Sequence, residues 1–258
     1  MARSKLPVLA KQFLAEALGT FLLVLFGDGA IAQYKAQLAS VTPTVFPSVA
    51  WGYGLALMIG ILVSGGVSGG HLNPAVTLAM ACLKKCSWKQ LVVYWLAQYL
   101  GALLGAALLF GLYFDAINEL PISDASAAGI FASFPGMSDL NIGTLIADQL
   151  VGTALLLIII LAVTDSRNMN VPSGLVTILI GLGLTAIHLS FAFNSGCAIN
   201  PARDLSPRVI SLLYMSSAFA AYDYFFWIPL IIPHVGAVFG AVIYYFGVEM
   251  HHEPDTLT

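Results

Sequence analysis

Long apolar runs alternate with short polar stretches along the whole chain. Each run has roughly the 20 residues that a helix needs to cross a hydrocarbon core about 30 Å thick. The pattern therefore predicts six transmembrane helices, at about 12–34, 49–66, 91–114, 144–163, 174–192 and 225–247.

Two further apolar segments are too short to span a membrane. "PAVTLAMACL" follows Asn73 and stops before Lys84, and "PARDLSPRVISLL" follows Asn200 and carries charges. Ten helical residues rise only about 15 Å. We therefore expect two re-entrant half-helices here, and the fold class becomes an all-α membrane protein with six transmembrane helices plus two half-helices.

Composition agrees with this class. Of the 258 residues, 59% are hydrophobic and 9% are charged, whereas soluble domains usually carry about 25% charged residues. A soluble protein this apolar could not cover its own surface with polar groups. The net charge of −3 is too small to suggest a nucleic acid partner. The three cysteines, Cys82, Cys86 and Cys197, have neither a disulfide framework nor a metal-binding spacing.

The pattern S-G-x-x-x-N-P-A occurs twice, at Ser68–Ala75 and at Ser195–Ala202, with the two Asn residues 200 − 73 = 127 positions apart. A Gly-x-x-x-Gly pair, which lets helix backbones approach closely, also recurs, at Gly101–Gly105 and Gly236–Gly240. Three predicted spans separate corresponding parts, so the two halves are inverted in the membrane. Inverted repeats place a functional pathway at their interface, near the bilayer midplane.

Charge sets the expected orientation. Basic residues fall at the N-terminus and in the even-numbered loops, at Arg3, Lys5, Lys11, Lys84, Lys85, Lys89 and Arg167. The third loop is acidic instead, with Asp115, Glu119, Asp124 and Asp139. The positive-inside rule then makes both termini cytoplasmic. The expected organisation is an N-terminus (1–11), a first repeat half (12–118), an extracellular loop (119–141), a second repeat half (142–247) and a C-terminal tail (248–258).

Each Asn-Pro-Ala is a helix start, at Asn73-Pro74-Ala75 and at Asn200-Pro201-Ala202. Asn is a favoured N-cap and Pro is favoured at the first helical position. Each helix N-terminus carries about half a positive charge, so two that meet at mid-membrane form a positive centre. The Asn side chains can cap their helices and still donate N–H groups into a pore. A water molecule held there would donate no hydrogen bond onward along the file, which excludes protons and cations while water passes.

These motifs resemble those of the aquaporin family, and within it the glycerol-facilitator branch. The resemblance extends from about Gln12 to Tyr245 and is carried by "GVSGGHLNPAVTLAM", "YWLAQYLGALLGAALLFGLYFDAI", "GIFASFPG" and "NSGCAINPARDLSPR". It implies a homotetramer with one pore per subunit, which passes water and, as further candidates, glycerol and other small neutral solutes. The residues that resemble markers of the glycerol branch are Asp204, Arg208, Pro229 and Leu230.

The resemblance also implies a selectivity filter of four side chains. Gap-free counting from the two motifs gives Tyr53, His188, Cys197 and Arg203, with Trp51 as the alternative to Tyr53 if the count slips. Glycerol facilitators commonly have a small residue at the position of His188 and an aromatic one at the position of Cys197. The pair found here is instead typical of water-selective aquaporins.

The two kinds of filter differ physically. Glycerol needs width, an apolar wall for its CH groups, and donors such as Arg203 opposite that wall. His188 would take up part of the width, so we expect fast water flow with glycerol slow or excluded. The alternative is that the Tyr53 or His188 side chain is displaced, which would leave an opening wide enough for an efficient aquaglyceroporin.

Three other residues are expected to support the re-entrant loops: Glu16, Gln149 and His71. An ionisable residue within a span is costly and usually functional, so Glu16 is expected to accept hydrogen bonds from loop backbone. Gln149 occupies the matching place in the second half, where the family more often has Glu. Asp28, near the outer end of the first span, has no assigned role.

Two other classes of protein share some of these features. A secondary transporter also has inverted repeats, and Glu16 and Asp148 are its candidates for ion coupling. An intramembrane hydrolase would use Ser68 near His71, but the repeat positions no general base. The sequence therefore predicts a channel, not an enzyme, with no catalytic residues, cofactor or metal. It is expected in the lipid bilayer of the plasma membrane.

Overall fold

The computed structural model describes residues 5–38, 47–120 and 127–252. Within these ranges every regular element is a helix. Arg3, Asp124 and the part of the expected tail that follows His252 lie outside the described residues.

Six helices in the described ranges are long and apolar enough to cross a membrane, which confirms the predicted fold class. They extend beyond the predicted apolar runs at most ends, because the helices continue into their polar flanks. They are α1 (Val8–Leu38), α2 (Pro47–Ser68), α4 (Trp88–Leu112), α7 (Ile142–Thr164), α8 (Ser173–Ser195) and α11 (Trp227–Gly247).

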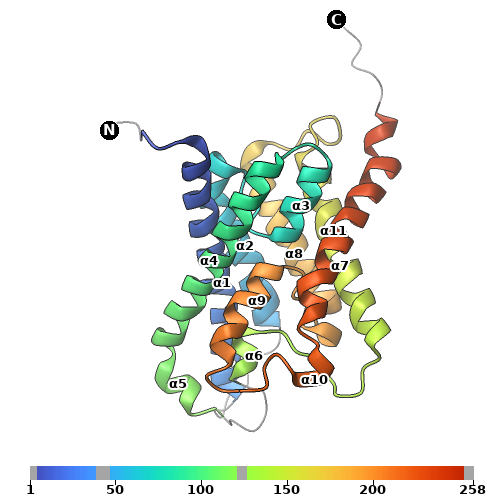
Figure 1. Cartoon of the computed structure of the whole chain (residues 1–258). Helices are drawn as coiled ribbons and strands as arrows, with labels where there is room; N and C mark the ends of the chain where they lie inside the picture. The colour runs from blue at the N-terminus through green and yellow to red at the C-terminus, as the bar shows by residue number, and fades with distance from the viewer. Residues whose placement is uncertain (1–4, 39–46, 121–126, 253–258) are drawn as a thin grey trace, which may run out of the picture.

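The two expected half-helices are α3 (Pro74–Cys82) and α9 (Pro201–Ser211). They enter from opposite ends of the molecule, and their N-termini meet near its middle (Figure 1). α1 begins and α11 ends at the same end of the molecule. The short helices at the other end are α5 (Phe114–Asn118), α6 (Ala128–Phe131) and α10 (Ala221–Tyr224), and a 3-10 turn, η1 (Glu249–His251), follows α11.

Helix contacts follow the internal repeat. α1 packs against α2 and α4, and α7 packs in the same way against α8 and α11. Each half-helix reaches across to the other half: α3 packs against α11 and α9 against α4. α2 and α8 form a further large contact between the halves. The halves are thus interlocked, and the space between them is where a pathway can lie.

Glycines bring the helices of each half into close contact. A Cβ atom on Gly101 would stand 2.2 Å from the carbonyl oxygen of Ala17, and one on Gly236 would stand 2.5 Å from that of Leu150. Because neither distance leaves room for a methyl group, both glycines are needed for backbone contact, as small residues in membrane helix packing usually are.

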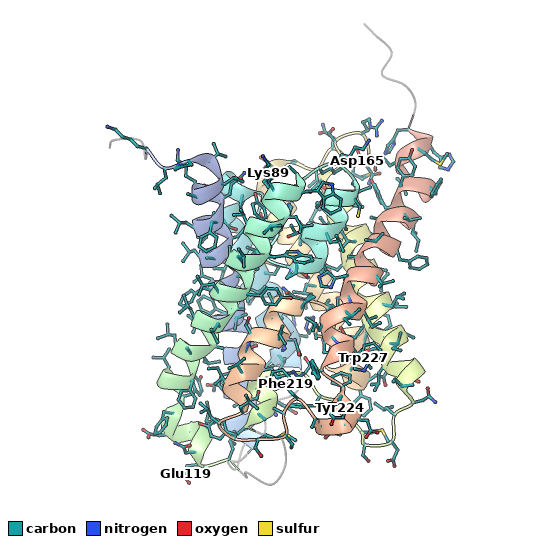
Figure 2. The ribbon with its side chains drawn as sticks, in the orientation of Figure 1. Lys89, Glu119, Asp165, Phe219, Tyr224 and Trp227 are labelled. Atoms are coloured by element: carbon teal, nitrogen blue, oxygen red, sulfur yellow. The ribbon has the colours of Figure 1, made fainter. Side chains whose placement is uncertain are left out.

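Asp165 ties the end of α7 to the C-terminal part of the chain. It lies at the end of the molecule where α1 begins, as does Lys89 (Figure 2). The Asp165 carboxylate accepts hydrogen bonds from Tyr244 (3.1 Å) and His252 (3.0 Å), so His252 is not the free, solvated residue that its place near the terminus suggests. Burial acts to raise the pKa of Asp165, but hydrogen bonds from the Arg167 backbone N–H, His252 and Tyr244 outweigh it, and the pKa is lowered.

The glycine contact gives a test of the packing of α4 against α1. Gly101→Ala is expected to destabilise the protein by about 1–3 kcal/mol, because overpacking forces the backbones apart. The measurement is the melting temperature of the purified protein in detergent, which should fall. Gly111→Ala in the same helix is the matched control, since nothing lies within 4 Å of its Cβ position. Equal melting temperatures for the two variants would contradict close α1–α4 packing at Gly101.

Candidate functional site

The two half-helices begin with the same capping arrangement. The side-chain oxygen of Asn73 accepts a hydrogen bond from the backbone N–H of Ala75 at 2.9 Å. That of Asn200 accepts from the N–H groups of Ala202 and Arg203 at 3.1 and 3.2 Å. Pro74 and Pro201 occupy the first helical position in each case, where the missing N–H costs nothing.

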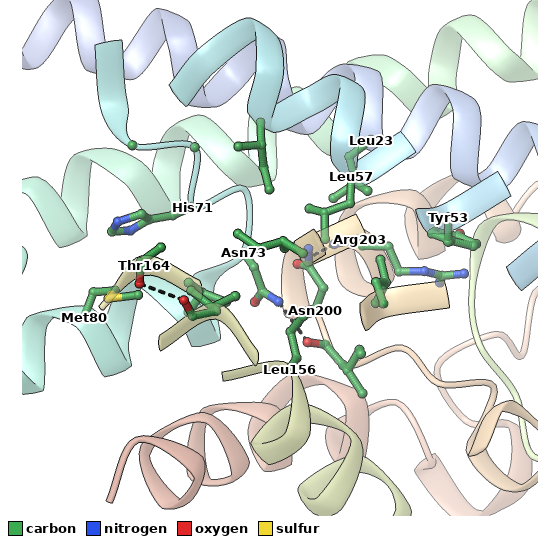
Figure 3. A pocket seen from close by; sticks show the side chains of 18 of the residues that line it. Leu23, Tyr53, Leu57, His71, Asn73, Met80, Leu156, Thr164, Asn200 and Arg203 are labelled. Carbon is green, nitrogen blue, oxygen red and sulfur yellow. Dashed lines mark hydrogen bonds between the residues drawn. The ribbon is translucent and has the colours of Figure 1, made fainter. Parts of the chain in front are cut away.

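The asparagines also join the two halves to each other. The side-chain nitrogen of Asn73 donates to the carbonyl of Ile199, and that of Asn200 donates to the carbonyl of Leu72, both at 2.9 Å. An amide NH₂ group has two donors, so each Asn keeps one N–H group for another partner. Figure 3 shows the two side chains at the middle of a cavity that both of them line.

The residues before the asparagines are held in unusual backbone conformations. Leu72 has a φ of 52° and Ile199 a φ of 35°, and both are almost fully buried. Such conformations of residues other than glycine cost about 1–3 kcal/mol each and persist only where their surroundings hold them. Here they aim the Leu72 and Ile199 carbonyls at the asparagine of the opposite half.

Glu16 holds the first re-entrant loop. It is fully buried in α1. Its carboxylate accepts hydrogen bonds from the Ser68 hydroxyl (2.6 Å), the His71 N–H (2.9 Å), the Leu72 N–H (2.8 Å) and the Gln98 amide (2.8 Å). One charged group thus satisfies four donors that would otherwise be buried without a partner.

Gln149 holds the second loop at the matching place. Its side-chain oxygen accepts from the Ile199 N–H at 2.9 Å, and its nitrogen donates to the Ser195 hydroxyl at 2.8 Å. A carboxylate at this place, like that of Glu16 in the first half, would instead accept a hydrogen bond from the serine hydroxyl. At Ser195 that proton goes to the neighbouring Asp148. Asp148 therefore supplies the acceptor that the Gln149 amide nitrogen cannot.

Two cavities lie in line through the molecule. The channel cavity, about 130 Å³ in volume, extends from Met80 and Thr164 past the asparagines to Tyr53 and Arg203 (Figure 3). Its apolar lining includes Leu23, Leu57, Leu156, Ile160, Ile180 and Leu184, which come from the membrane-spanning helices. The two re-entrant loops also line it, with Gly69, Gly70, His71, Ala198 and Ile199.

The second, wider cavity, about 420 Å³, opens toward the end of the molecule that carries α6 and α10. We call it the vestibule; Lys35, Ser133, Phe134 and Tyr222 are among its lining residues. Tyr53, His188 and Arg203 are the residues of the described chain that line both cavities. The passage between channel cavity and vestibule is therefore bounded by these three side chains.

The three side chains that line both cavities also contact one another. The Tyr53 and His188 rings are stacked, with centroids 5.1 Å apart and planes 11° from parallel. The Arg203 guanidinium carbon lies 4.7 Å from the centre of the Tyr53 ring. Nδ1 of His188 is 3.1 Å from the carbonyl oxygen of Leu184. A carbonyl can only accept, so Nδ1 carries the proton and Nε2 is an acceptor in the neutral ring.

Two other filter candidates line neither cavity. Trp51 is 46% exposed on the outer surface of α2, whereas Tyr53 is 2% exposed, so Tyr53 is the residue of the two beside Arg203. Cys197 is buried in the apolar core and is not among the residues that line either cavity. Its neighbours Gly196 and Ala198 line the vestibule and the channel cavity instead.

The branch markers Asp204 and Arg208 fix the loop beside the filter. Asp204 accepts hydrogen bonds from Arg208 at 2.8 and 3.0 Å and from the Ser133 N–H at 2.8 Å. Arg208 donates to the Ser133 carbonyl at 2.6 Å, and Arg203 donates to the Ser133 hydroxyl at 3.2 Å. Ser133 lies in the "GIFASFPG" stretch, but nothing in the sequence marked it individually. The other two markers, Pro229 and Leu230, lie in α11 and line neither cavity.

His71, Ser68 and the acids Glu16 and Asp148 have partners that differ from those a hydrolase or an ion-coupled carrier would need. The His71 ring pairs with the Thr77 hydroxyl (3.2 Å), and the Ser68 hydroxyl donates to Glu16, so the two do not bond to each other. Glu16 and Asp148 are both engaged with loop residues. Among the described residues, no three His, Cys, Asp or Glu side chains gather in a group that could hold a metal ion.

Comparison with known proteins places this geometry in context. The profile of the major intrinsic protein family matches residues 3–244. The chain is 44% identical to Aquaporin-9 of Homo sapiens over 258 residues, covering 96% of this chain and 86% of that protein. It is 43% identical to Aquaporin-10 of Milnesium tardigradum over 264 residues, covering 94% of this chain but 64% of that protein.

A solved structure is similar over nearly the whole chain. The X-ray structure of the aquaglyceroporin from Plasmodium falciparum aligns with a TM-score of 0.84 and 32% sequence identity. The alignment covers 93% of this chain and 97% of that one. The inverted halves and the meeting half-helices described above thus belong to a fold already seen in a related protein.

Glu16 offers a direct test of loop support. Glu16→Gln puts an amide nitrogen where an acceptor is needed, and the loss of charge-assisted hydrogen bonds is expected to cost about 1.5–3 kcal/mol each. The melting temperature and the water flow per folded protein should both fall. Glu119→Gln, at an exposed residue, is the control and should leave both unchanged. Parent-like stability of Glu16→Gln would mean that the loop is held by other contacts.

Proposed function

The chain belongs to the major intrinsic protein family, and from that premise we propose that it conducts water in preference to glycerol. The protein is a transmembrane channel for water and small neutral solutes such as glycerol, in a family of channels that are not enzymes. The proposal concerns the choice between these solutes.

The observation that supports water preference is the shared boundary of the two cavities. A permeating molecule must pass between Tyr53, His188 and Arg203, each at most 4% exposed. The stacked Tyr53 and His188 rings occupy one side of the passage, so His188 takes space where a smaller residue would leave an opening. Water needs only the donors of Arg203 and the acceptor of His188, whereas glycerol also needs width for its carbon chain.

Proton exclusion follows from the middle of the channel. Asn73 and Asn200 each retain one N–H group after their bonds across the halves, and each sits at a helix N-terminus that carries about half a positive charge. A water molecule there accepts hydrogen bonds from both amides. It then has no lone pair free for a proton from the next water, which breaks the chain along which protons would move. The interruption thus lies in what this water can accept and not, as expected from the sequence, in what it can donate.

Assembly and orientation complete the proposal. We propose a homotetramer in the plasma membrane with one pore per subunit and both termini in the cytoplasm. Orientation is supported by charge, because Lys84, Lys85 and Arg167 lie in loops, and Lys89 in the first turn of α4, at the end where α1 begins. The opposite end carries Glu119 and the aromatic residues Phe219, Tyr224 and Trp227 (Figure 2). The vestibule is then extracellular.

Stopped-flow measurement on proteoliposomes tests solute choice. A sucrose gradient gives water permeability from the rate of vesicle shrinkage, and a glycerol gradient gives glycerol permeability from the rate of reswelling. We expect the vesicles to shrink fast in both gradients and to reswell slowly in the glycerol gradient. Reswelling as fast as that of the Plasmodium falciparum aquaglyceroporin, measured in parallel, would show an efficient glycerol channel and contradict the proposal.

His188 is the residue on which this proposal depends. His188→Gly removes the ring and is expected to raise glycerol permeability several-fold while changing water permeability only modestly. Leu189→Gly is the matched control, because it places the same flexible residue in α8 at a half-exposed neighbour outside both cavities. The same glycerol permeability in parent and His188→Gly would place the narrowest point elsewhere.

A further inference from the structure

A buried carboxylate lies directly behind the filter. Asp28, in α1, is completely buried and lines neither cavity. Its Oδ1 accepts the hydroxyl proton of Tyr53 and lies 3.8 Å from Nη2 of Arg203. Its other oxygen, Oδ2, is buried without a hydrogen-bond donor among the described residues. A carboxylate that is only half satisfied inside a membrane helix is costly, and such residues are usually functional.

We propose that Asp28 is a positioning residue that determines the specificity of the filter in two ways. It fixes the position of the Tyr53 ring, and it neutralises the charge of Arg203. This rests on the proposed function only in that Tyr53, His188 and Arg203 form the narrowest passage. The two effects act on different solutes, since the ring sets the width and the charge sets which ions are repelled.

Two adjacent residues of α1, Gly27 and Asp28, fix the position of the Tyr53 ring. A Cβ atom on Gly27 would stand 2.4 Å from Cε1 of Tyr53, so only a glycine there leaves space for the ring. Asp28 then holds the hydroxyl at the far end of the same ring. The ring is thereby fixed against both the His188 ring and the Arg203 guanidinium. Without the hydroxyl bond, the ring keeps its packing contacts but loses the bond that fixes its tilt.

Charge balance gives Asp28 its second role. Two arginines and two aspartates form a buried group in which formal charges cancel. Asp204 is closely paired with Arg208 at 2.8 and 3.0 Å and lies 3.8 Å from Arg203. Asp28 approaches Arg203 at 3.8 Å and has no other cationic partner among the described residues. Arg203 can therefore present donors to the passage without an uncompensated positive charge that would attract anions.

Two single substitutions separate the roles. Asp28→Asn keeps an oxygen that can accept the Tyr53 proton but removes the negative charge. Tyr53→Phe keeps the charge but removes the hydroxyl bond. Each variant is reconstituted in proteoliposomes with the parent and with the lipid-facing control Phe26→Leu. Stopped-flow gives the ratio of glycerol to water permeability, and an anion-sensitive dye inside the vesicles gives nitrate flux.

We expect Asp28→Asn to raise nitrate flux several-fold at a parent-like glycerol-to-water ratio, and Tyr53→Phe to raise that ratio several-fold at parent-like nitrate flux. A residue that merely stabilised the fold would lower all fluxes together and leave the ratio unchanged. Parent-like nitrate flux in Asp28→Asn, or a parent-like ratio in Tyr53→Phe, overturns the proposal. If Asp28→Asn does not fold, a parent-like ratio in Tyr53→Phe still overturns the proposal, because the proposal requires both roles. Fast glycerol flux in the parent itself would contradict water preference without affecting the nitrate result.

Discussion

The structure depends on a reciprocal pair of hydrogen bonds at its centre. Each asparagine side chain caps its own half-helix and donates to a carbonyl of the opposite half. These bonds require the Leu72 and Ile199 carbonyls to point across the interface, which both residues achieve only with a positive φ. That strain is maintained because Glu16 and Gln149 bind the N–H groups of Leu72 and Ile199. The membrane-spanning helices serve to bring these few groups together.

The proposed filter of Tyr53, His188 and Arg203 adds solute selection to this frame. The chain resembles aquaglyceroporins over nearly its whole length, and its markers Asp204 and Arg208 anchor the loop that carries Ser133. Those residues shape the rim of the passage. The rings of Tyr53 and His188 bound the passage itself, and its width acts directly on the solute. Overall sequence similarity to aquaglyceroporins and the chemistry of the narrowest part of the proposed channel are thus separate properties of this chain.

The spans and half-helices could be predicted because they depend on local sequence, namely the length of apolar runs and the helix-starting Asn-Pro-Ala. The rotation of each helix about its own axis, which decides which side chains face the channel, could not be predicted as well. Tyr53 and Trp51 stand two positions apart, and only the packed helix shows that one faces Arg203 while the other is on the outer surface. Asp28 had no assigned role for the same reason, since its partners come from α2 and α9. Cys197 was expected in the filter by counting, but its φ of 47° belongs to a turn in which the neighbouring residues line the cavities.

The central claim is that the two asparagines let water pass and stop protons. It is tested most directly by measuring both fluxes in the same proteoliposomes, with osmotic shrinkage reporting water and a pH-sensitive dye inside reporting protons. The account predicts water flow that rises with the amount of protein while proton flux stays at the level of protein-free vesicles. Proton flux that rises in proportion to water flow would contradict it.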